Sequence, residues 1–331
     1  MRVAVVGAGS WGTTVASLAS RNCATVLWSR RPEVAREIVE AHTNERYLPG
    51  VMLPPNLGAS AELEAVVREA DVLVIAVPSH GFREVVRELI PFVRPWIPVV
   101  SLTKGVEQGS LLRMTEIIDE LLPGHPAGVL TGPNLAKEIM AGQAAASVIG
   151  MEDLVVAEAL QGVFAGGLYR VYTNHDVIGC EVGGALKNVI AIAAGIAEAI
   201  SVGDNTRAMV ITRGLAELTH LGVALGGEPA TLAGLAGMGD LLATCMSPQS
   251  RNRLVGEQLG LGRKIEDIIA DMNMVAEGVK TTASVVELAG RHDVEMPIAE
   301  EMYAVLYEGR AAAEAYRGLQ QRKAGHERDS G

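Results

Sequence analysis

The sequence predicts an α/β protein in which a doubly wound, mostly parallel sheet is followed by an all-helical domain. Three observations predict this fold class. The first half alternates short apolar runs with helical patterns, the second half keeps only helical periodicity, and 331 residues are enough for two domains. We expect the sheet domain over 1–178, the helical domain over 179–320 and a polar, disordered tail over 321–331.

The apolar runs of the first half predict the strands. Arg2–Val6 precedes a helical pattern over 10–21, and Ala24–Trp28 precedes another over 31–42, with a proline in its first turn. The run DVLVIAV at 71–77 is the strongest strand signal in the chain. The series, which is typical of a mostly parallel sheet, continues with runs at 97–102, 127–130, 144–150 and 168–173.

Strand patterns stop after about residue 178. Residues 180–203 predict one long, mostly apolar helix whose Ala and Gly residues allow close neighbours. Its most apolar stretch, 189–200, carries Glu198 and is too short to span a bilayer, so we expect no integral membrane segment. These small residues suit a homodimer interface as well as an internal core. Later segments with helical periodicity are 204–222, 249–259, 279–290 and 297–308.

Composition narrows the partners and the compartment. The net charge of −11 argues against nucleic acid or an anionic membrane as the main partner, but a local basic cluster can still bind a small anionic substrate. Cys23, Cys180 and Cys245 are far apart in sequence, which suits neither a metal site nor a disulfide framework and fits a reducing cytoplasm. Glycines interrupt the apolar N-terminal stretch, so we expect no signal peptide.

A G-x-G-x-x-G match at residues 7–12 directly follows the first strand and opens the first helix. This is the context of a dinucleotide-binding, Rossmann-type loop. Gly7 permits the tight turn, Gly9 lets the backbone approach a pyrophosphate, and Gly12 lets helix and sheet pack closely. The helix N-terminus then offers free N–H groups and a positive dipole end. The alternative is a tight turn without a ligand.

The end of the second strand indicates which dinucleotide binds. An NAD site usually has an acidic residue there, about 20 residues beyond the glycines, to bind the ribose 2′-hydroxyl. Here the corresponding residues are Ser29, Arg30 and Arg31. Two guanidinium groups match a 2′-phosphate by charge and by geometry, so NADP is favoured over NAD. The alternative is a pair of solvated arginines at a strand end.

Nicotinamide chemistry also needs a group that transfers a proton as the hydride moves, and two lysines stand out. Lys104 follows a strand of the parallel sheet, at the carboxyl edge where such sheets bind ligands. Lys187 lies within the long apolar helix, with Asn188 beside it. It is either a surface lysine with a buried stem or an active-site cation with a lowered pKa.

Downstream, two polar groups follow a glycine-rich turn. GLAGMGDLLATC leads to Asp240 and Thr244. Ser250, Arg251 and Asn252 then lie at an apparent helix start, which suits an anion because N–H groups and a guanidinium converge there. Ordinary N-capping by Ser250 explains the same pattern, and neither interpretation excludes the other.

Taken together, seven stretches resemble the NAD(P)-dependent glycerol-3-phosphate dehydrogenase family, most nearly its bacterial type, in pattern and in order. The resemblance covers residues 2 to about 310. It implies interconversion of dihydroxyacetone phosphate and sn-glycerol 3-phosphate for phospholipid synthesis, with the nicotinamide meeting the substrate between the two domains. The stretches are GAGSWGTTVA, SLTKGVE, TGPNLAKE, VGGALKNVIAIAAG, GLAGMGDLLATC, SRNR and VAEGVKT.

The resemblance also implies residue roles. Lys187 becomes the general acid for the carbonyl oxygen, and the base in reverse, while Asp240 orients Lys187 or a substrate hydroxyl. Position 134 is Asn where many relatives have Ser or Thr, but it keeps a hydrogen-bonding side chain. The resemblance assigns substrate contacts to Lys104, Gly132, Asn134, Asp240 and Thr244. It assigns binding of the substrate's phosphate group to Ser250, Arg251 and Asn252. Cofactor contacts fall to Gly7, Gly9, Ser10, Trp11, Gly12, Arg30, Arg31, Tyr47, Lys104, Ala136, Arg251, Val275 and Glu277.

Two other functions stay open at this point. A ketopantoate or hydroxyacid reductase would share the Rossmann-type domain and a lysine on a long helix, but an unphosphorylated substrate has no use for the cluster at 250–252. A non-catalytic NADP sensor would keep the glycine loop and the two arginines, but has no use for Lys187.

Overall fold

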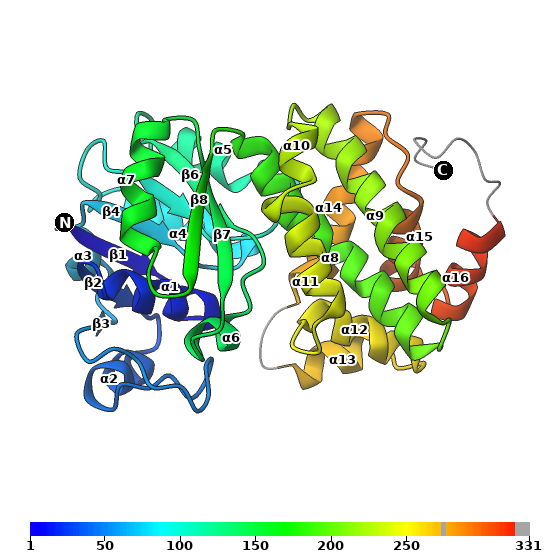
Figure 1. The fold of residues 1–331 in the computed structure, drawn as a ribbon, viewed down its shortest axis with the longest axis horizontal. Coiled ribbons are helices and arrows are strands. Elements are labelled where there is room, and N and C mark those ends of the chain that lie inside the picture. The colour runs from blue at the N-terminus through cyan, green and yellow to red at the C-terminus, as the bar shows by residue number, and fades with distance from the viewer. Residues whose placement is uncertain (273–275, 322–331) are drawn as a thin grey trace. The chain divides into compact units, whose positions relative to one another are not determined.

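The computed structural model describes residues 1–272 and 276–321, which form two compact units (Figure 1). The first unit comprises Met1–Thr103 and Arg113–Val177. The second comprises Lys104–Leu112 together with the residues described from Ile178 onward. Val275 and the segment 322–331, which holds nearly all of the tail predicted to be disordered, lie outside the described residues.

The first unit is built on one eight-stranded sheet in the order β3-β2-β1-β4-β5-β6-β7-β8. Its strands are β1 (Arg2–Val6), β2 (Ala24–Trp28), β3 (Gly58–Ser60), β4 (Val72–Ile75), β5 (Val99–Ser101), β6 (Ala127–Thr131), β7 (Ala145–Met151) and β8 (Tyr169–Asn174). Its helices are α1 (Ser10–Ser20), α2 (Pro32–Glu40), α3 (Leu63–Val67), α4 (Phe82–Leu89), α5 (Met114–Leu121), α6 (Ala136–Met140) and α7 (Leu154–Phe164), with a 3₁₀ turn η1 (Ser79–Gly81).

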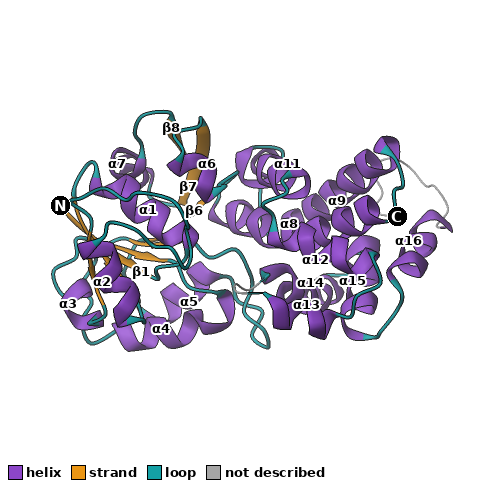
Figure 2. Cartoon of the chain, turned by 90° about the horizontal axis from the view of Figure 1, so that it is seen from below, coloured by secondary structure: helices purple, strands orange, loops and turns teal. Residues whose placement is uncertain are grey.

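The sheet is doubly wound, as predicted. Every neighbouring pair of strands is parallel except β6 and β7, which run antiparallel. Figure 2 shows α1 and α7 on one side of the sheet and α4 and α5 on the other. Both faces of the central strands are therefore covered, and β4 is buried along its whole length, which explains its continuous apolar sequence.

The strand order reverses at β1, and this reversal positions the ligand-binding edge. After β1 the chain builds β2 and β3 on one side, and then returns to place β4 on the other side of β1. Loops leaving the carboxyl ends of β1 and β4 therefore border the same crevice, where open α/β sheets bind their ligands. The loop after β1 is the glycine-rich stretch 7–12.

From Ile178 onward the described residues form helices and connecting turns with no strand, which confirms the predicted change of architecture after about residue 178. The helices of the second unit are α8 (Val177–Ala199), α9 (Asp204–Ala224), α10 (Pro229–Leu232), α11 (Asp240–Met246), α12 (Arg251–Gly260), α13 (Ile265–Asp271), α14 (Glu277–Arg291), α15 (Pro297–Tyr307) and α16 (Ala312–Gln321). A π-helical turn, η2 (Leu235–Gly239), leads into α11.

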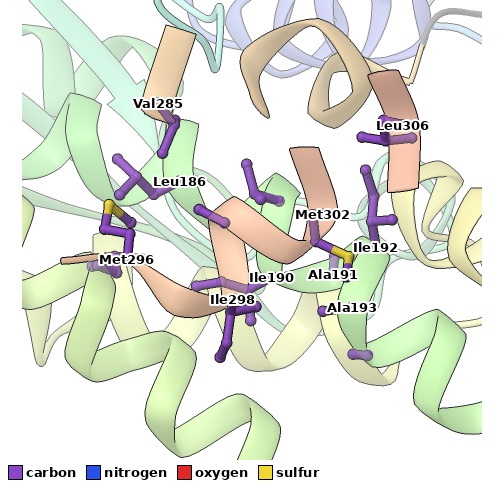
Figure 3. Packing of buried hydrophobic residues seen from close by; sticks show 14 of the residues in the cluster. Leu186, Ile190, Ala191, Ile192, Ala193, Val285, Met296, Ile298, Met302 and Leu306 are labelled. Carbon is purple, nitrogen blue, oxygen red and sulfur yellow. The ribbon is translucent and has the colours of Figure 1, made fainter. Parts of the chain in front are cut away.

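The long helix α8 is the centre of this unit. Its buried side chains form one cluster with residues of α14 and α15, and Figure 3 shows Leu186 and Ile190 packed among them. With 23 residues, α8 extends well before the stretch 189–200 and is long and apolar enough to cross a bilayer by length and composition. However, 94% of its most apolar window is buried inside the protein, as in any core helix.

The segment Lys104–Leu112 connects two consecutive elements of the sheet unit but packs with the helical unit. It leaves at the end of β5, and the chain rejoins the sheet unit at Arg113. Val106 and Leu111 are buried in the same cluster as α8. This excursion fixes the backbone directly beside Lys104 within the helical unit.

Candidate active site

Two lysines converge on one buried carboxylate in the helical unit. Lys187 Nζ donates to Asp240 Oδ1 at 2.7 Å, and Lys104 Nζ donates to Asp240 Oδ2 at 2.6 Å. Only 2% of the Asp240 side chain is exposed, against 7% for Lys187 and 16% for Lys104. The three groups come from α8, the start of α11 and the segment after β5. The structure therefore brings together residues 83 and 53 positions apart in the chain.

Thr244 is the fourth residue of this cluster, and its hydroxyl bonds both Asp240 and Lys187. Its hydroxyl donates to the backbone oxygen of Asp240 at 2.7 Å, one helical turn earlier, and accepts from Lys187 Nζ at 2.6 Å. An ammonium group has three protons to donate. Among the residues that the structure describes, Asp240 and Thr244 engage two of the protons of Lys187. One N–H is left for another acceptor.

Close backbone contacts explain why Asp240 lies beside Lys187. A Cβ atom at Gly183, one turn before Lys187 on α8, would come within 2.6 Å of the backbone oxygen of Ala236. A Cβ atom at Gly237 would come within 1.9 Å of the backbone oxygen of Leu232. Glycine is required at both positions, so the sequence GLAGMGD folds tightly against α8 and presents Asp240 to it.

The cluster carries an excess positive charge. Two ammonium groups surround one carboxylate, which leaves one net positive charge in a largely buried place. Burial lowers the pKa of Lys104 to about 8, and the neighbouring charge of Lys187 adds to this effect while Asp240 opposes it. Such a site attracts an anion and holds a lysine that exchanges its proton near neutral pH.

The thiol of Cys245 lies beside this cluster but stays protonated. Burial raises its pKa to about 12, Asp240 contributes in the same direction, and Lys187 opposes the shift. A thiol with so high a pKa is a poor nucleophile at neutral pH. The reactive groups of the cluster are therefore its amines.

A second chain of hydrogen bonds links three helices of the same unit. Asn188 Nδ2 donates to the backbone oxygen of Lys104 at 3.4 Å, and Asn252 Nδ2 donates to Asn188 Oδ1 at 2.8 Å. The backbone N–H of Gly278 donates to Asn252 Oδ1 at 2.9 Å. The start of α12 is thereby tied to α8 and to the start of α14. Sequence reasoning gave Asn188 no role, although its place directly after Lys187 was a signal for one.

The predicted anion site at the start of α12 also has a structural role. Ser250 Oγ accepts the backbone N–H of Arg253 at 3.3 Å, so Ser250 is the N-cap of α12. Arg251 is the first residue of that helix and Glu277 the first residue of α14. Desolvation lowers the pKa of the Arg251 guanidinium, and the negative charge of Glu277 opposes the change.

The glycine loop in the sheet unit fits a dinucleotide. Gly7 has a φ of +119°, and a Cβ atom on Gly12 would lie 2.0 Å from its backbone oxygen, so the protein's own packing requires both glycines. A Cβ atom on Gly9, in contrast, would meet nothing within 4 Å. Gly9 is also the N-cap of α1, and no side chain caps that helix. The open space and the uncapped N–H groups suit a pyrophosphate.

Two further predicted cofactor residues belong to α1. Ser10 is its first residue, directly after the N-cap. Trp11 Nε1 is buried without a hydrogen-bond partner among the described residues.

Arg31 and Tyr47 lie together beyond the end of β2. Hydrogen bonding to Tyr47 is the main cause that raises the pKa of Arg31, and Glu33 lies 3.5 Å from its guanidinium. Burial of the Tyr47 phenol is outweighed by its hydrogen bonds to Arg46 and Arg31, which lower its pKa. The Arg46 guanidinium also lies 5.6 Å from the centre of the Tyr47 ring. Sequence reasoning missed Arg46, which adjoins a predicted residue.

Arg30 is the more open of the two predicted arginines. Its side chain is exposed, and no carboxylate pairs with it in the part of the chain that the structure describes. Tyr47 thus bonds two guanidinium groups, those of Arg31 and Arg46, and Arg30 adds an exposed third next to Arg31, which suits a phosphate.

The last predicted residues lie where β6 ends. Gly132 has a φ of +124°, which an L side chain rarely adopts. Asn134 accepts a hydrogen bond from Ser147, and Ala136 begins α6. This loop belongs to the sheet unit, whereas the lysine cluster belongs to the helical unit.

Comparison with known proteins identifies the family. The family model described as the NAD-dependent glycerol-3-phosphate dehydrogenase N-terminus matches residues 2–157, and its C-terminus counterpart matches residues 176–317. The chain belongs to this family. A glycerol-3-phosphate dehydrogenase [NAD(P)+] of Sphingopyxis alaskensis is 58% identical over 100% of the chain and 99% of its own length.

Solved structures agree with this assignment. The crystal structure of the glycerol-3-phosphate dehydrogenase of Coxiella burnetii is 36% identical, covers 97% of this chain and 99% of its own, and superposes with a TM-score of 0.93. A ketopantoate reductase from Ralstonia eutropha, at 18% identity and a TM-score of 0.58 over 96% of this chain and 100% of its own, shares the fold alone.

Proposed function

We propose that this member of the family interconverts dihydroxyacetone phosphate and sn-glycerol 3-phosphate with NADP or NAD, and that Lys187 transfers the proton. The relative from Sphingopyxis alaskensis, matched along its whole length, supports the reaction. The observation that carries the assignment of Lys187 is the buried cluster in which one carboxylate holds two lysines and one N–H of Lys187 is left over.

The cofactor's place is in the sheet unit. Residues 7–12 would bind the pyrophosphate at the start of α1. Arg30 and Arg31 would bind a 2′-phosphate, with Tyr47 next to Arg31. When bound, the nicotinamide supplies the hydride that reduces the carbonyl carbon. Ala136, Glu277 and Val275 remain predicted cofactor contacts, although Val275 lies outside the described residues.

Lys187 supplies the proton to the carbonyl oxygen as that oxygen gains negative charge. Its ammonium group is held by Asp240 and Thr244, so the free N–H has a fixed direction. In the reverse reaction the neutral amine removes the proton from the substrate hydroxyl. Lys104 keeps positive charge next to the same oxygen, because the second oxygen of Asp240 binds it.

The phosphate end of the substrate is assigned to the start of α12. The N–H groups of the first turn and the guanidinium of Arg251 offer donors and positive charge to an anion. Ser250 and Asn252 position that turn through their own hydrogen bonds. Phospholipid synthesis, cytoplasmic localisation and a homodimer remain predictions.

The first experiment is a substrate comparison. Purified protein is mixed with NADPH and with dihydroxyacetone phosphate, dihydroxyacetone or ketopantoate, and the loss of NADPH absorbance is followed. We expect rapid turnover of the phosphorylated triose alone, because only that substrate engages both the lysine cluster and the anion site. Turnover of ketopantoate, or of none of the three, would refute the proposed reaction.

Substitution of Lys187 tests the proton transfer. Lys187→Ala is expected to lower kcat by about 10³-fold, within the range that general acids contribute. The dissociation constant for NADPH, measured by its fluorescence, should change little because Lys187 is not among the predicted cofactor contacts. Lys264→Ala removes an exposed lysine of the helical unit and serves as the control. A near-normal kcat in Lys187→Ala would remove Lys187 from its role.

The pH dependence tests Lys104. Its ammonium is charged below a pKa of about 8 and neutral above it, so the positive charge that attracts the phosphorylated substrate is lost as pH rises. We expect kcat/KM for dihydroxyacetone phosphate to fall above about pH 8. In Lys104→Arg the falling limb should move to higher pH, since a guanidinium does not deprotonate there. An unmoved limb would assign the titration to another group.

Cofactor choice tests the two arginines after β2. The double variant Arg30→Ala, Arg31→Ala is expected to raise KM for NADPH about tenfold or more, since each charged hydrogen bond to a phosphate is worth about 1.5–3 kcal/mol. KM for NADH should change little, because NADH lacks the 2′-phosphate. Arg36→Ala, an exposed arginine of α2, is the control. An equal rise in KM for NADPH and for NADH would show that the two arginines do not bind the 2′-phosphate.

A further inference from the structure

Asn134, which is half-buried in the loop that follows β6, forms a hydrogen-bonded chain with two buried residues of β7 and β8. Ser147 Oγ lies 2.5 Å from Asn134 Oδ1 and within hydrogen-bonding distance of the Tyr169 phenol oxygen. Ser147 is fully buried, and Tyr169 is 4% exposed. Tyr169 pairs with Ala145, two residues before Ser147, so the two side chains are diagonal neighbours on one face of β7 and β8.

The direction of this chain follows from its chemistry. An amide oxygen only accepts hydrogen bonds, so the Ser147 hydroxyl donates to Asn134 and has its lone pairs free to accept from Tyr169. Burial raises the pKa of the Tyr169 phenol, which therefore keeps its proton and donates it to Ser147. With the Asn134 amide turned over, Ser147 would donate to Tyr169 and the phenol proton would have no acceptor. The observed orientation satisfies both hydroxyl groups.

The same orientation leaves the amide nitrogen of Asn134 without a partner. Nδ2 is buried, and no described residue accepts a hydrogen bond from it. A buried polar atom in this state destabilises the protein unless a ligand or water satisfies it. Its unused N–H groups therefore point to an acceptor outside the described residues, such as a bound ligand.

The backbone of the loop holds this geometry in place. Gly132 adopts a φ of +124°, and a Cβ atom on it would lie 3.2 Å from both the Ala146 oxygen and the Ser147 Cα atom. The loop thus runs directly over β7 at Ser147. Asn134, two residues later, reaches the serine hydroxyl without rearrangement of the strand.

We propose that Ser147 and Tyr169 are positioning residues that fix the Asn134 amide so that its nitrogen donates to an oxygen of the triose phosphate. The inference rests on the proposed function, together with the prediction from the sequence that Asn134 contacts the substrate. A neutral donor of fixed direction recognises a hydroxyl or carbonyl oxygen without adding charge. Neither Ser147 nor Tyr169 touches the substrate in this arrangement.

Tyr169→Phe is the first test because it removes one oxygen and keeps the ring in the core. We expect KM for dihydroxyacetone phosphate to rise about 3- to 10-fold, the effect of one hydrogen bond, with kcat and the NADPH dissociation constant little changed. Tyr172→Phe, on the same strand but exposed, is the matched control and should behave as the unmodified protein. A rise confined to NADPH binding would instead assign the Asn134 donor to the cofactor and overturn the proposal.

A double-variant cycle separates positioning from a purely structural role. Asn134→Ala alone should raise KM for the substrate, and adding Tyr169→Phe or Ser147→Ala to it should cause no further rise. If Tyr169→Phe raises KM by the same factor in both backgrounds, the positioning role is wrong. If Asn134→Ala leaves KM unchanged, it is the assignment of Asn134 to the substrate that fails. Thermal melting of each variant confirms that it is folded.

Discussion

The buried carboxylate of Asp240 is the constraint on which the site depends. Two ammonium groups as deeply placed as Lys187 and Lys104 would repel each other and be expensive to desolvate without it. Each of its oxygens binds one lysine, so the three side chains must approach from different directions. The glycines at 183 and 237 let the backbone before Asp240 come close enough to α8 for this to happen.

The path of residues Lys104–Leu112 through the helical unit also brings a lysine to Asp240. A chain that continued directly from β5 to α5 would have no reason to leave the sheet unit. Instead it enters the helical unit, buries Val106 and Leu111 there, and returns at Arg113, whose backbone N–H donates to the Glu116 side chain at 2.8 Å where α5 begins. The buried side chains of Val106 and Leu111 hold the backbone next to Lys104, so their packing positions Lys104 beside Asp240.

Much of this architecture could be predicted because it depends on hydrophobic patterns between residues that are close in the sequence. Apolar runs located β1, β2 and β4, and the loss of such runs located the helical unit. The strand β3, three residues of Gly, Ala and Ser, has no such pattern and was missed, since its pairing with β2 alone defines it. Motifs singled out Lys187, Asp240 and Lys104 as candidates. Their meeting at one carboxylate and the partners of Asn134 depend on contacts between distant residues, which local patterns do not contain.

The sharing of one carboxylate also bears on the charge balance of the proposed proton transfer. An ammonium paired with its own carboxylate is a poor acid, because proton loss would leave a buried negative charge unpaired. Here Asp240 has a second cation. In the proposed reaction, when Lys187 becomes neutral, Lys104 still pairs with Asp240 and the cluster changes from one net positive charge to none. In the proposed reaction Lys104 would therefore be more than a substrate contact, because it keeps Asp240 paired while Lys187 is without its proton.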